Sequence, residues 1–238
     1  MYKRQALRLY RERMFRNANF VLALTYGSFA GVLFLLPIFL QELRGLSALQ
    51  SGLTTFPQAI GVMISSQLVG RLYHRVGPRR LIAGGMFAMA VVTTALVFVD
   101  LTTSLWWIRL IMFARGICMA FSFVPLQAAT YANITPQDTG RATAIFSTQR
   151  QVAAALGVSL LTTVLIEQAN SLTVLVGGSA AQAANLLSGF HLAFLTGALI
   201  VLGAAFVGLL IRDSDAASTM RPRGTPTEVG TPVAALVD

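Results

Sequence analysis

The chain has 238 residues, of which 55% are hydrophobic and only 11% are charged, and its formal net charge is +9. Soluble domains carry about 25% charged residues, so this composition excludes an ordinary water-soluble protein. The positive charge does not indicate nucleic-acid binding either, because the basic residues form no face with stacking aromatics on a polar scaffold. They lie in short gaps between long apolar runs, which is typical of a protein of the lipid bilayer.

The apolar runs predict the architecture. A helix that crosses the roughly 30 Å hydrocarbon core needs about 20 apolar residues. Runs near this length occupy residues 20–40, 53–69, 81–99, 105–129, 142–166 and 190–211. Helices are expected because open strands would leave backbone groups unpaired in lipid. The sequence therefore predicts an all-α integral membrane domain of six transmembrane helices over residues 19–212.

The segments outside these runs are polar. Residues 1–18 are basic, and Leu7, Tyr10 and Met14 are spaced so that a short helix on the inner leaflet is one interpretation and a plain linker the other. Residues 213–238 are rich in Ser, Thr, Pro and Gly and predict a disordered cytoplasmic tail. The many small residues of 170–188 predict a long outer loop.

The basic residues predict the orientation. Most of the 18 Lys and Arg residues lie before the first run, between the second and third, at Arg141 between the fourth and fifth, or after the sixth. Cytoplasmic loops carry such an excess, so both termini are expected on the cytoplasmic side of the plasma (inner) membrane. Trp106 and Trp107 then mark the outer interface.

A weak internal repeat accompanies this topology. Pro37 and Gly52 are separated by the same number of residues as Pro125 and Gly140. The first proline lies on a run that leads outward and the second on a run that leads inward. A three-plus-three inverted repeat would produce this pattern, and coincidence is the alternative.

Arg115 is the sharpest candidate for a functional residue, because charges within membrane spans are costly. It follows Trp107 by about 12 Å along a helix, which is near the midplane. One hypothesis is a cavity-lining cation that contacts substrate or a carboxylate. The other is a structural pair with a backbone carbonyl or an acid on another helix.

Two further runs carry polar stripes at helical spacing. Such stripes should face a water-filled cavity or a neighbouring helix rather than lipid. The stripes consist of Thr54, Gln58, Gly61 and Ser65 on the second run, and of Thr143, Ser147 and Arg150 on the fifth.

Pairs of small residues predict close helix packing. Gly27 and Gly31 form one pair and Ala153 and Gly157 another, each four positions apart. This spacing allows backbones to approach closely, but it identifies no partner helix.

Several kinds of chemistry have no residues to support them. The runs hold no Asp or Glu at depth, and Glu42 and Glu167 lie at outer ends. His74 and His191 lack metal-ligand spacing, and no Gly-rich phosphate loop or nucleophile elbow is present. The sequence thus predicts no enzyme, no catalytic residue, no metal site and no cofactor.

The gap between the second and third runs carries a recognisable pattern. It resembles the signature loop of the major facilitator superfamily, in which a cytoplasmic latch pairs its charges with neighbouring helix ends. Here His74 stands where that family has Asp, and tight turns are expected at Gly70 and Gly77. The residues that carry the resemblance are Gly70, His74, Arg75, Gly77, Arg79 and Arg80.

Other stretches are similar to the second half of the fourteen-span drug/proton antiporters of the EmrB/QacA type. They are residues 15–20, 44–52, 123–127 and 136–142, and the resemblance covers about residues 14–212. It implies the C-terminal half of a transporter that exports amphipathic organic compounds by alternating access. In that family the proton-carrying acids belong chiefly to the first half.

This interpretation has consequences for residues and partners. Arg115, Arg150, Gln58 and Gln127 are the predicted transport-pathway residues. The expected partners are the lipid bilayer, a small amphipathic substrate, and a matching N-terminal half or a second copy of the chain. The alternative is a non-transporting membrane assembly module or an inactive transporter fragment.

Overall fold

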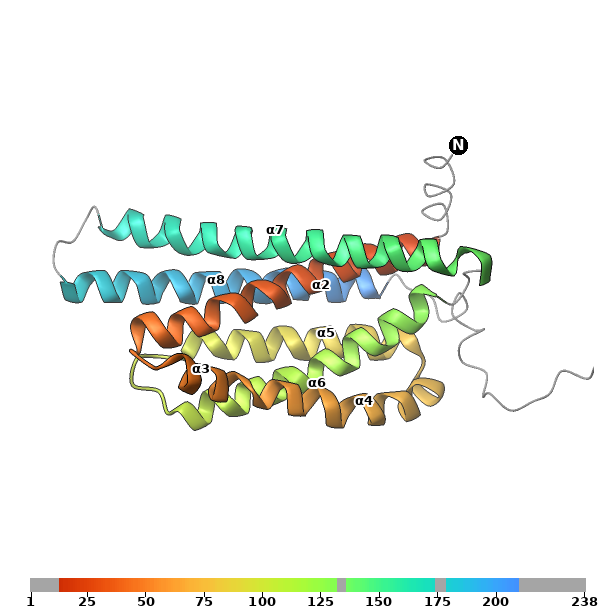
Figure 1. Ribbon diagram of the computed structural model, residues 1–238, viewed down its shortest axis with the longest axis horizontal. Helices are drawn as coiled ribbons and strands as arrows, with labels where there is room; N and C mark the ends of the chain where they lie inside the picture. Colours follow the sequence, from red (N-terminus) through yellow and green to blue (C-terminus); the bar gives the residue numbers. More distant parts are fainter. Residues whose placement is uncertain (1–12, 132–135, 174–178, 210–238) are drawn as a thin grey trace, which may run out of the picture.

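The chain folds as a helical bundle in a computed structural model that describes residues 13–131, 136–173 and 179–209 (Figure 1). No strand occurs in these ranges. The long helices are α2 (Arg13–Ile38), α4 (Pro57–Val76), α5 (Pro78–Thr94), α6 (Leu105–Thr130), α7 (Thr139–Thr173) and α8 (Ser179–Gly208). Shorter elements are the π-helical turn η1 (Phe39–Leu43), the helix α3 (Ala48–Thr55), and the 3₁₀ turns η2 (Ala95–Phe98) and η3 (Pro136–Asp138).

Most of the predicted spans are confirmed. Among the described residues, five helices are long and apolar enough to cross a membrane: Arg16–Leu43, Pro78–Phe98, Leu105–Ala128, Thr139–Asn170 and Ala183–Gly208. The predicted second span, 53–69, is helical but does not reach the same hydropathy. Its chain breaks between α3 and α4 at Phe56, and Gln58, Ser65, Ser66 and Gln67 make α4 more polar than the other helices.

The predicted outer loop at 170–188 is wrong at both of its ends. Helix α7 continues to Thr173 and α8 already begins at Ser179. The start of α8 is rich in alanine, the best helix former, so a drop in hydropathy does not mark the end of a helix there. Helix α2 begins at Arg13, inside the predicted N-terminal segment. The predictions for 1–12 and for the tail lie outside the described residues.

The helix contacts follow an inverted repeat. Helix α2 packs along α7 as α6 packs along α4, and α2 packs on α8 as α6 packs on α5. Helices α2 and α6 run in opposite directions through the bundle (Figure 1). Pro37 lies near the end of α2 and Pro125 near the end of α6. The predicted three-plus-three architecture therefore matches these packing partners.

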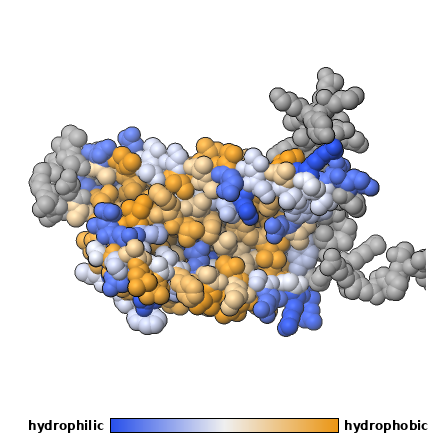
Figure 2. Space-filling model, viewed as in Figure 1, coloured by the Kyte–Doolittle hydropathy of each residue, from blue (hydrophilic) through white to orange (hydrophobic). Residues whose placement is uncertain are grey.

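Two ends of the bundle differ in charge. The start of α2, the α4–α5 turn, η3 and the end of α8 lie together at the right of Figure 1. We call this the basic end, because it carries Arg16, Arg71, Arg75, Arg79, Arg80 and Arg141. The opposite end, with exposed Trp106 and Trp107, is called the far end. Figure 2 shows hydrophilic residues at both ends and hydrophobic residues between them, as a lipid-facing surface requires.

Small residues bring two helix pairs into backbone contact; the four-residue spacing predicted close packing for α2 and for α7, but not that they contact each other. A Cβ atom on Gly157 would collide with the carbonyl oxygen of Gly27. A Cβ on Gly116 of α6 would likewise collide with the carbonyl oxygen of Gln58 in α4. Dispersion contacts at this range, rather than a hydrophobic effect, hold helices together in lipid. The pairs α2–α7 and α4–α6 are therefore the closest-packed parts of the bundle described above.

Candidate functional site

An aromatic cluster lies between α2 and α6, with Phe29 buried and the other two rings partly buried. The ring centroids of Tyr26 and Phe29, both on α2, are 5.8 Å apart. Phe123 of α6 approaches Tyr26 at 5.6 Å and Phe29 at 6.2 Å, both edge to face. Aromatic pairs favour such arrangements at these distances. Tyr26 lies about 15 Å along the helix from Arg16 at the basic end, so the cluster is near mid-depth.

Two arginines from different helices lie over rings of this aromatic cluster. The guanidinium carbon of Arg150, on α7, lies 5.4 Å from the centroid of the Tyr26 ring. The guanidinium carbon of Arg115, on α6, lies 5.3 Å from the centroid of the Phe29 ring. Both separations are within the range of a cation–π interaction. Three helices, α2, α6 and α7, thus contribute to one constellation of two cations and three rings.

Arg115 is entirely buried, with 0% of its surface exposed. Its Nη2 donates to the carbonyl oxygen of Phe29 at 3.4 Å, a long hydrogen bond. Its Nε and Nη1 have no hydrogen-bond partner among the described residues. Arg115 therefore bonds a backbone carbonyl, as one of the two hypotheses predicts, but most of its N–H donors have no acceptor among the described residues. It does not line an open cavity, because the Phe29 ring lies in front of it.

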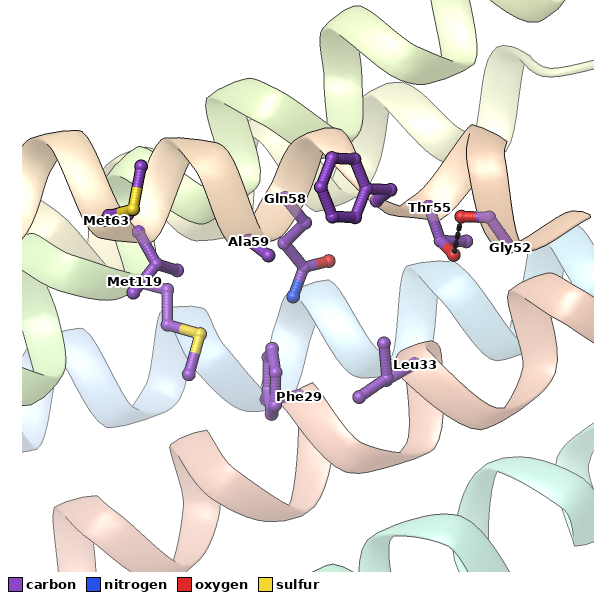
Figure 3. A pocket seen from close by; sticks show the side chains of 10 residues that line it. Phe29, Leu33, Gly52, Thr55, Gln58, Ala59, Met63 and Met119 are labelled. Carbon is purple, nitrogen blue, oxygen red and sulfur yellow. Dashed lines mark hydrogen bonds between the residues drawn. The ribbon is translucent and has the colours of Figure 1, made fainter.

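A pocket of about 590 Å³ opens beside the cluster (Figure 3). Phe29 belongs to both the cluster and the pocket, and Gln58 points its side-chain amide toward Phe29 across the space. Gln58 is 6% exposed, and its Oε1 has no partner among the described residues. The pocket is otherwise mainly apolar, and its walls are Phe29, Leu33, Gly52, Thr55, Phe56, Gln58, Ala59, Val62, Met63 and Met119.

A groove of about 650 Å³ follows α7 on the other side of α2. Leu33 faces the pocket while the adjacent Phe34 faces the groove. The α7 span is the least buried of the five, at 17% against 44% or more for the others. Its groove face combines small residues with the polar side chains of Gln151, Ser159, Thr162 and Thr163, a composition typical of helix–helix contacts in membranes. The groove residues are Phe34, Gln151, Ala154, Ala155, Val158, Ser159, Thr162, Thr163 and Ile166.

The two predicted polar stripes have different surroundings. Thr54, Gln58, Gly61 and Ser65 are all buried, and Gly61 packs on the backbone of α6. This stripe therefore faces a neighbouring helix, as one of the two interpretations predicts, and Gln58 in addition lines the pocket. Thr143 and Ser147 are exposed and Arg150 is half-buried, so the stripe on α7 is open.

The structure gathers three of the four predicted pathway residues. Arg115, Arg150 and Gln58 surround the aromatic cluster, whereas Gln127 is exposed on α6 and does not line the pocket. Sequence reasoning missed the cluster itself. The available signal was the pair of aromatic residues three positions apart on the first span, next to the glycine pair.

The signature stretch forms a one-residue turn. Helix α4 ends at Val76 and α5 begins at Pro78, and Gly77 alone joins them with φ of 84°. Only glycine adopts such a conformation readily, and proline suits the first position of a helix. The predicted turn at Gly70 is wrong, because Gly70 lies within α4, where the periodic apolar pattern continues past it. The side chain of His74 lies outside the described residues, and Arg75, Arg79 and Arg80 are exposed.

Acidic residues are remote from the aromatic cluster. Those that the structure describes are Glu42, Asp100, Asp138 and Glu167. Asp138, in η3, lies 3.1 Å from Arg141. The other three lie in η1, just after η2 and near the end of α7, the parts of these elements that point away from the basic end. In the described ranges no group of His, Cys, Asp or Glu is arranged to hold a metal ion.

Comparison with known proteins places the chain in a family. The family model described as Major Facilitator Superfamily matches residues 3–158. The chain belongs to this superfamily. With its apolar helices, it is therefore an integral membrane protein of a transporter superfamily, as the signature stretch predicted.

Individual relatives are similar over most of the chain. It is 35% identical over 141 residues to an uncharacterized MFS-type transporter, YhcA, of Bacillus subtilis, covering 59% of this chain and 26% of that one. It is 30% identical over 162 residues to the multidrug export protein EmrB of Escherichia coli K12, covering 66% and 31%. A multidrug resistance protein B homolog of Mycobacterium tuberculosis is 29% identical over 173 residues, covering 69% and 31%. The chain thus spans less than a third of the length of these relatives.

Proposed function

We propose that this chain forms the C-terminal half of a drug/proton antiporter that exports amphipathic organic compounds by alternating access. One observation carries the proposal: an aromatic cluster between two arginines lies at mid-depth beside a mainly apolar pocket. Transporters of this kind bind substrate near the bilayer midplane, where repeats meet. Aromatic and aliphatic walls with few polar groups suit compounds that are partly apolar.

We assign the transport pathway to the pocket and its neighbours. Phe29, Gln58 and Met119 line the space itself, and Arg150 lies over Tyr26, whose ring contacts Phe29. Arg115 acts from behind the Phe29 ring as a positioning residue. We propose that Gln127 contacts the substrate only near the basic end of the pathway, since its side chain is exposed there.

The other half of the transporter comes from a matching N-terminal half or from a second copy of this chain. The groove along the sparsely buried helix α7 supports this, because its small residues and polar side chains are typical of helix–helix contacts in membranes. The matched region covers 31% of the length of EmrB and of the Mycobacterium tuberculosis relative, so those proteins have room for another half. In addition, the described part of the chain offers no acid near the site that could carry a proton through the membrane.

We propose that the basic end faces the cytoplasm of the plasma (inner) membrane, with both termini on that side. The excess of arginine at this end supports the orientation. The Gly77 turn and its neighbours Arg75, Arg79 and Arg80 would then be a cytoplasmic latch, in which the guanidinium groups bond helix ends exposed during switching.

A binding measurement tests the site. The purified chain in lipid nanodiscs is titrated with the neutral fluorescent dye N-phenyl-1-naphthylamine, and Gln58→Leu and Phe29→Ala are compared with Phe98→Ala. Phe98 is a control because it is 75% exposed and lies outside the pocket. Saturable binding that both pocket variants weaken and the control preserves would support the proposal. Binding that is equal in all variants would assign the dye to the lipid-facing surface and favour a non-transporting assembly module.

A further inference from the structure

We propose that the site selects amphipathic anions: an aromatic body lies against Tyr26, Phe29 and Phe123 while its negative group bonds Arg150. This inference rests on the proposed function and names its substrate class. The premise is the sign of the charges around the cluster. Two guanidinium groups flank it, and among the described residues no carboxylate faces them.

The balance of charge on the surrounding helices is one-sided. The described residues of α2, α4, α6 and α7 include one acidic residue, Glu167. It lies about 25 Å along α7 from Arg150, counted at 1.5 Å per residue. Glu42 of η1 is about 20 Å beyond Phe29 by the same count. Over these distances neither acid can pair with the guanidinium groups at the cluster, so the site stays positive.

Hydrogen-bond donors without a partner also favour an anionic ligand. The Nε and Nη1 of Arg115 and the Nε of Arg150 are buried and have no partner among the described residues. Such donors are costly until an acceptor satisfies them, and the strongest acceptor for a guanidinium group is an anionic oxygen. A cationic ligand would leave the Nε of Arg150 unpaired and add repulsion, whereas the donors of Arg115, which does not touch the ligand, raise the positive potential of the site in either case.

The two arginines have different roles in this arrangement. Arg150 is half-buried, so a ligand that enters beside Tyr26 can reach it. Arg115 has no exposed surface and adds positive potential from behind Phe29 without touching the ligand. The amide of Gln58 can donate to an anion or to a neutral oxygen, so it does not discriminate by charge.

A set of ligands with one ring system and three charges tests this selectivity. The purified chain in nanodiscs of zwitterionic phosphatidylcholine is titrated with pyrene-1-sulfonate, 1-pyrenemethanol and 1-pyrenemethylammonium, and binding to empty nanodiscs is subtracted. The sulfonate should bind at least about tenfold more tightly than the ammonium compound, with the alcohol between them. A cation that binds as tightly as the anion would overturn the inference.

Variants locate the selectivity. Arg150→Gln should reduce the anion-to-cation preference to within about twofold, and Arg150→Lys should retain part of it. The matched control is Arg141→Gln, which removes the same charge from the same helix at an exposed position beside Asp138. An unchanged preference in Arg150→Gln, or an equal loss in Arg141→Gln, contradicts the role of Arg150.

The outcomes separate this inference from the proposed function. If all three pyrenes bind equally and Gln58→Leu weakens them all, the pocket is a binding site and the charge selectivity is wrong. If no pyrene binds more than it does to empty nanodiscs, the pocket is not a binding site, and both the proposed function and the selectivity are wrong.

Discussion

Arg115 contacts the same residue twice. Its guanidinium group lies over the ring of Phe29 at 5.3 Å, and its Nη2 donates to the carbonyl oxygen of Phe29 at 3.4 Å. Because Phe29 also lines the pocket, a residue that never touches the pocket fixes the orientation of its wall. The contact joins α6 to α2, so a shift between these helices would change the shape of the pocket directly.

Replacing Arg115 by methionine should separate binding from folding. The thermal unfolding temperature should stay the same or rise, since a charge with unpaired donors is replaced by an apolar side chain of similar length. Affinity for N-phenyl-1-naphthylamine should fall several-fold, because Phe29 loses a cation–π contact of about 1–2 kcal/mol. Arg115→Lys should recover only part of the affinity, since lysine lacks the planar fork.

The control for Arg115 is Arg109→Met on the same helix. The guanidinium carbon of Arg109 lies 4.8 Å from the Trp106 ring centroid, so this variant also removes a cation–π contact, but toward the far end. It should bind the dye normally. If Arg115→Met unfolds while the remaining folded protein binds with full affinity, Arg115 is a structural residue alone.

The backbone contact between α2 and α7 should make Gly157 intolerant of any side chain. Gly157→Ala should lower the free energy of unfolding by about 1–3 kcal/mol, because the added methyl group meets the carbonyl oxygen of Gly27 and forces the helices apart. Gly84→Ala is the matched control, since nothing lies within 4 Å of a Cβ at that position. Unfolding of both variants in mixed micelles, followed by circular dichroism, should show the difference; equal stability would mean that the two helices pack less closely.

The α4–α5 turn makes a similar contrast within one stretch. Gly77→Ala should destabilise the protein by about 1–3 kcal/mol, because φ of 84° is strained for any residue with a Cβ. Gly70→Ala should be neutral or stabilising, since that position is helical and open. The same unfolding measurement decides between them, and a destabilising Gly70→Ala would restore a turn or packing role to that residue.

Sequence reasoning succeeded where one physical signal dominates. Apolar length located α2, α5 and α6, and the spacing of Gly27 and Gly31 indicated a close contact. It failed at residues 170–188, because alanine-rich helix and loop have similar hydropathy. It also placed a turn at Gly70, since composition alone does not show which of two glycines has a positive φ.

The candidate site was only partly accessible from sequence. The cost of a buried charge singled out Arg115 and Arg150, and polarity singled out Gln58. The aromatic cluster was missed because Phe and Tyr are ordinary residues in membrane helices, and only the contact of α2 with α6 brings Tyr26, Phe29 and Phe123 together. Gln127 has the same residue type as Gln58 but lies on an exposed face, which its sequence context does not reveal.

The orientation of the chain can be checked with single cysteines. In a Cys118→Ser background, His74→Cys and Ser179→Cys place thiols at opposite ends of the bundle. In intact cells an impermeant maleimide should label position 179 and leave position 74 unlabelled until the membrane is opened. The reverse pattern would invert the proposed topology.

The central claim is that this chain supplies the substrate site of a transporter and needs another half to move protons. Proteoliposomes with an imposed pH gradient are loaded with dye, and efflux is followed for the purified chain alone and for the chain with a matching N-terminal half. The chain alone should give only background efflux. The pair should transport, and Gln58→Leu should abolish that transport. Robust pH-driven efflux by the chain alone, or transport by the pair that the Gln58 variant leaves unchanged, would contradict this account.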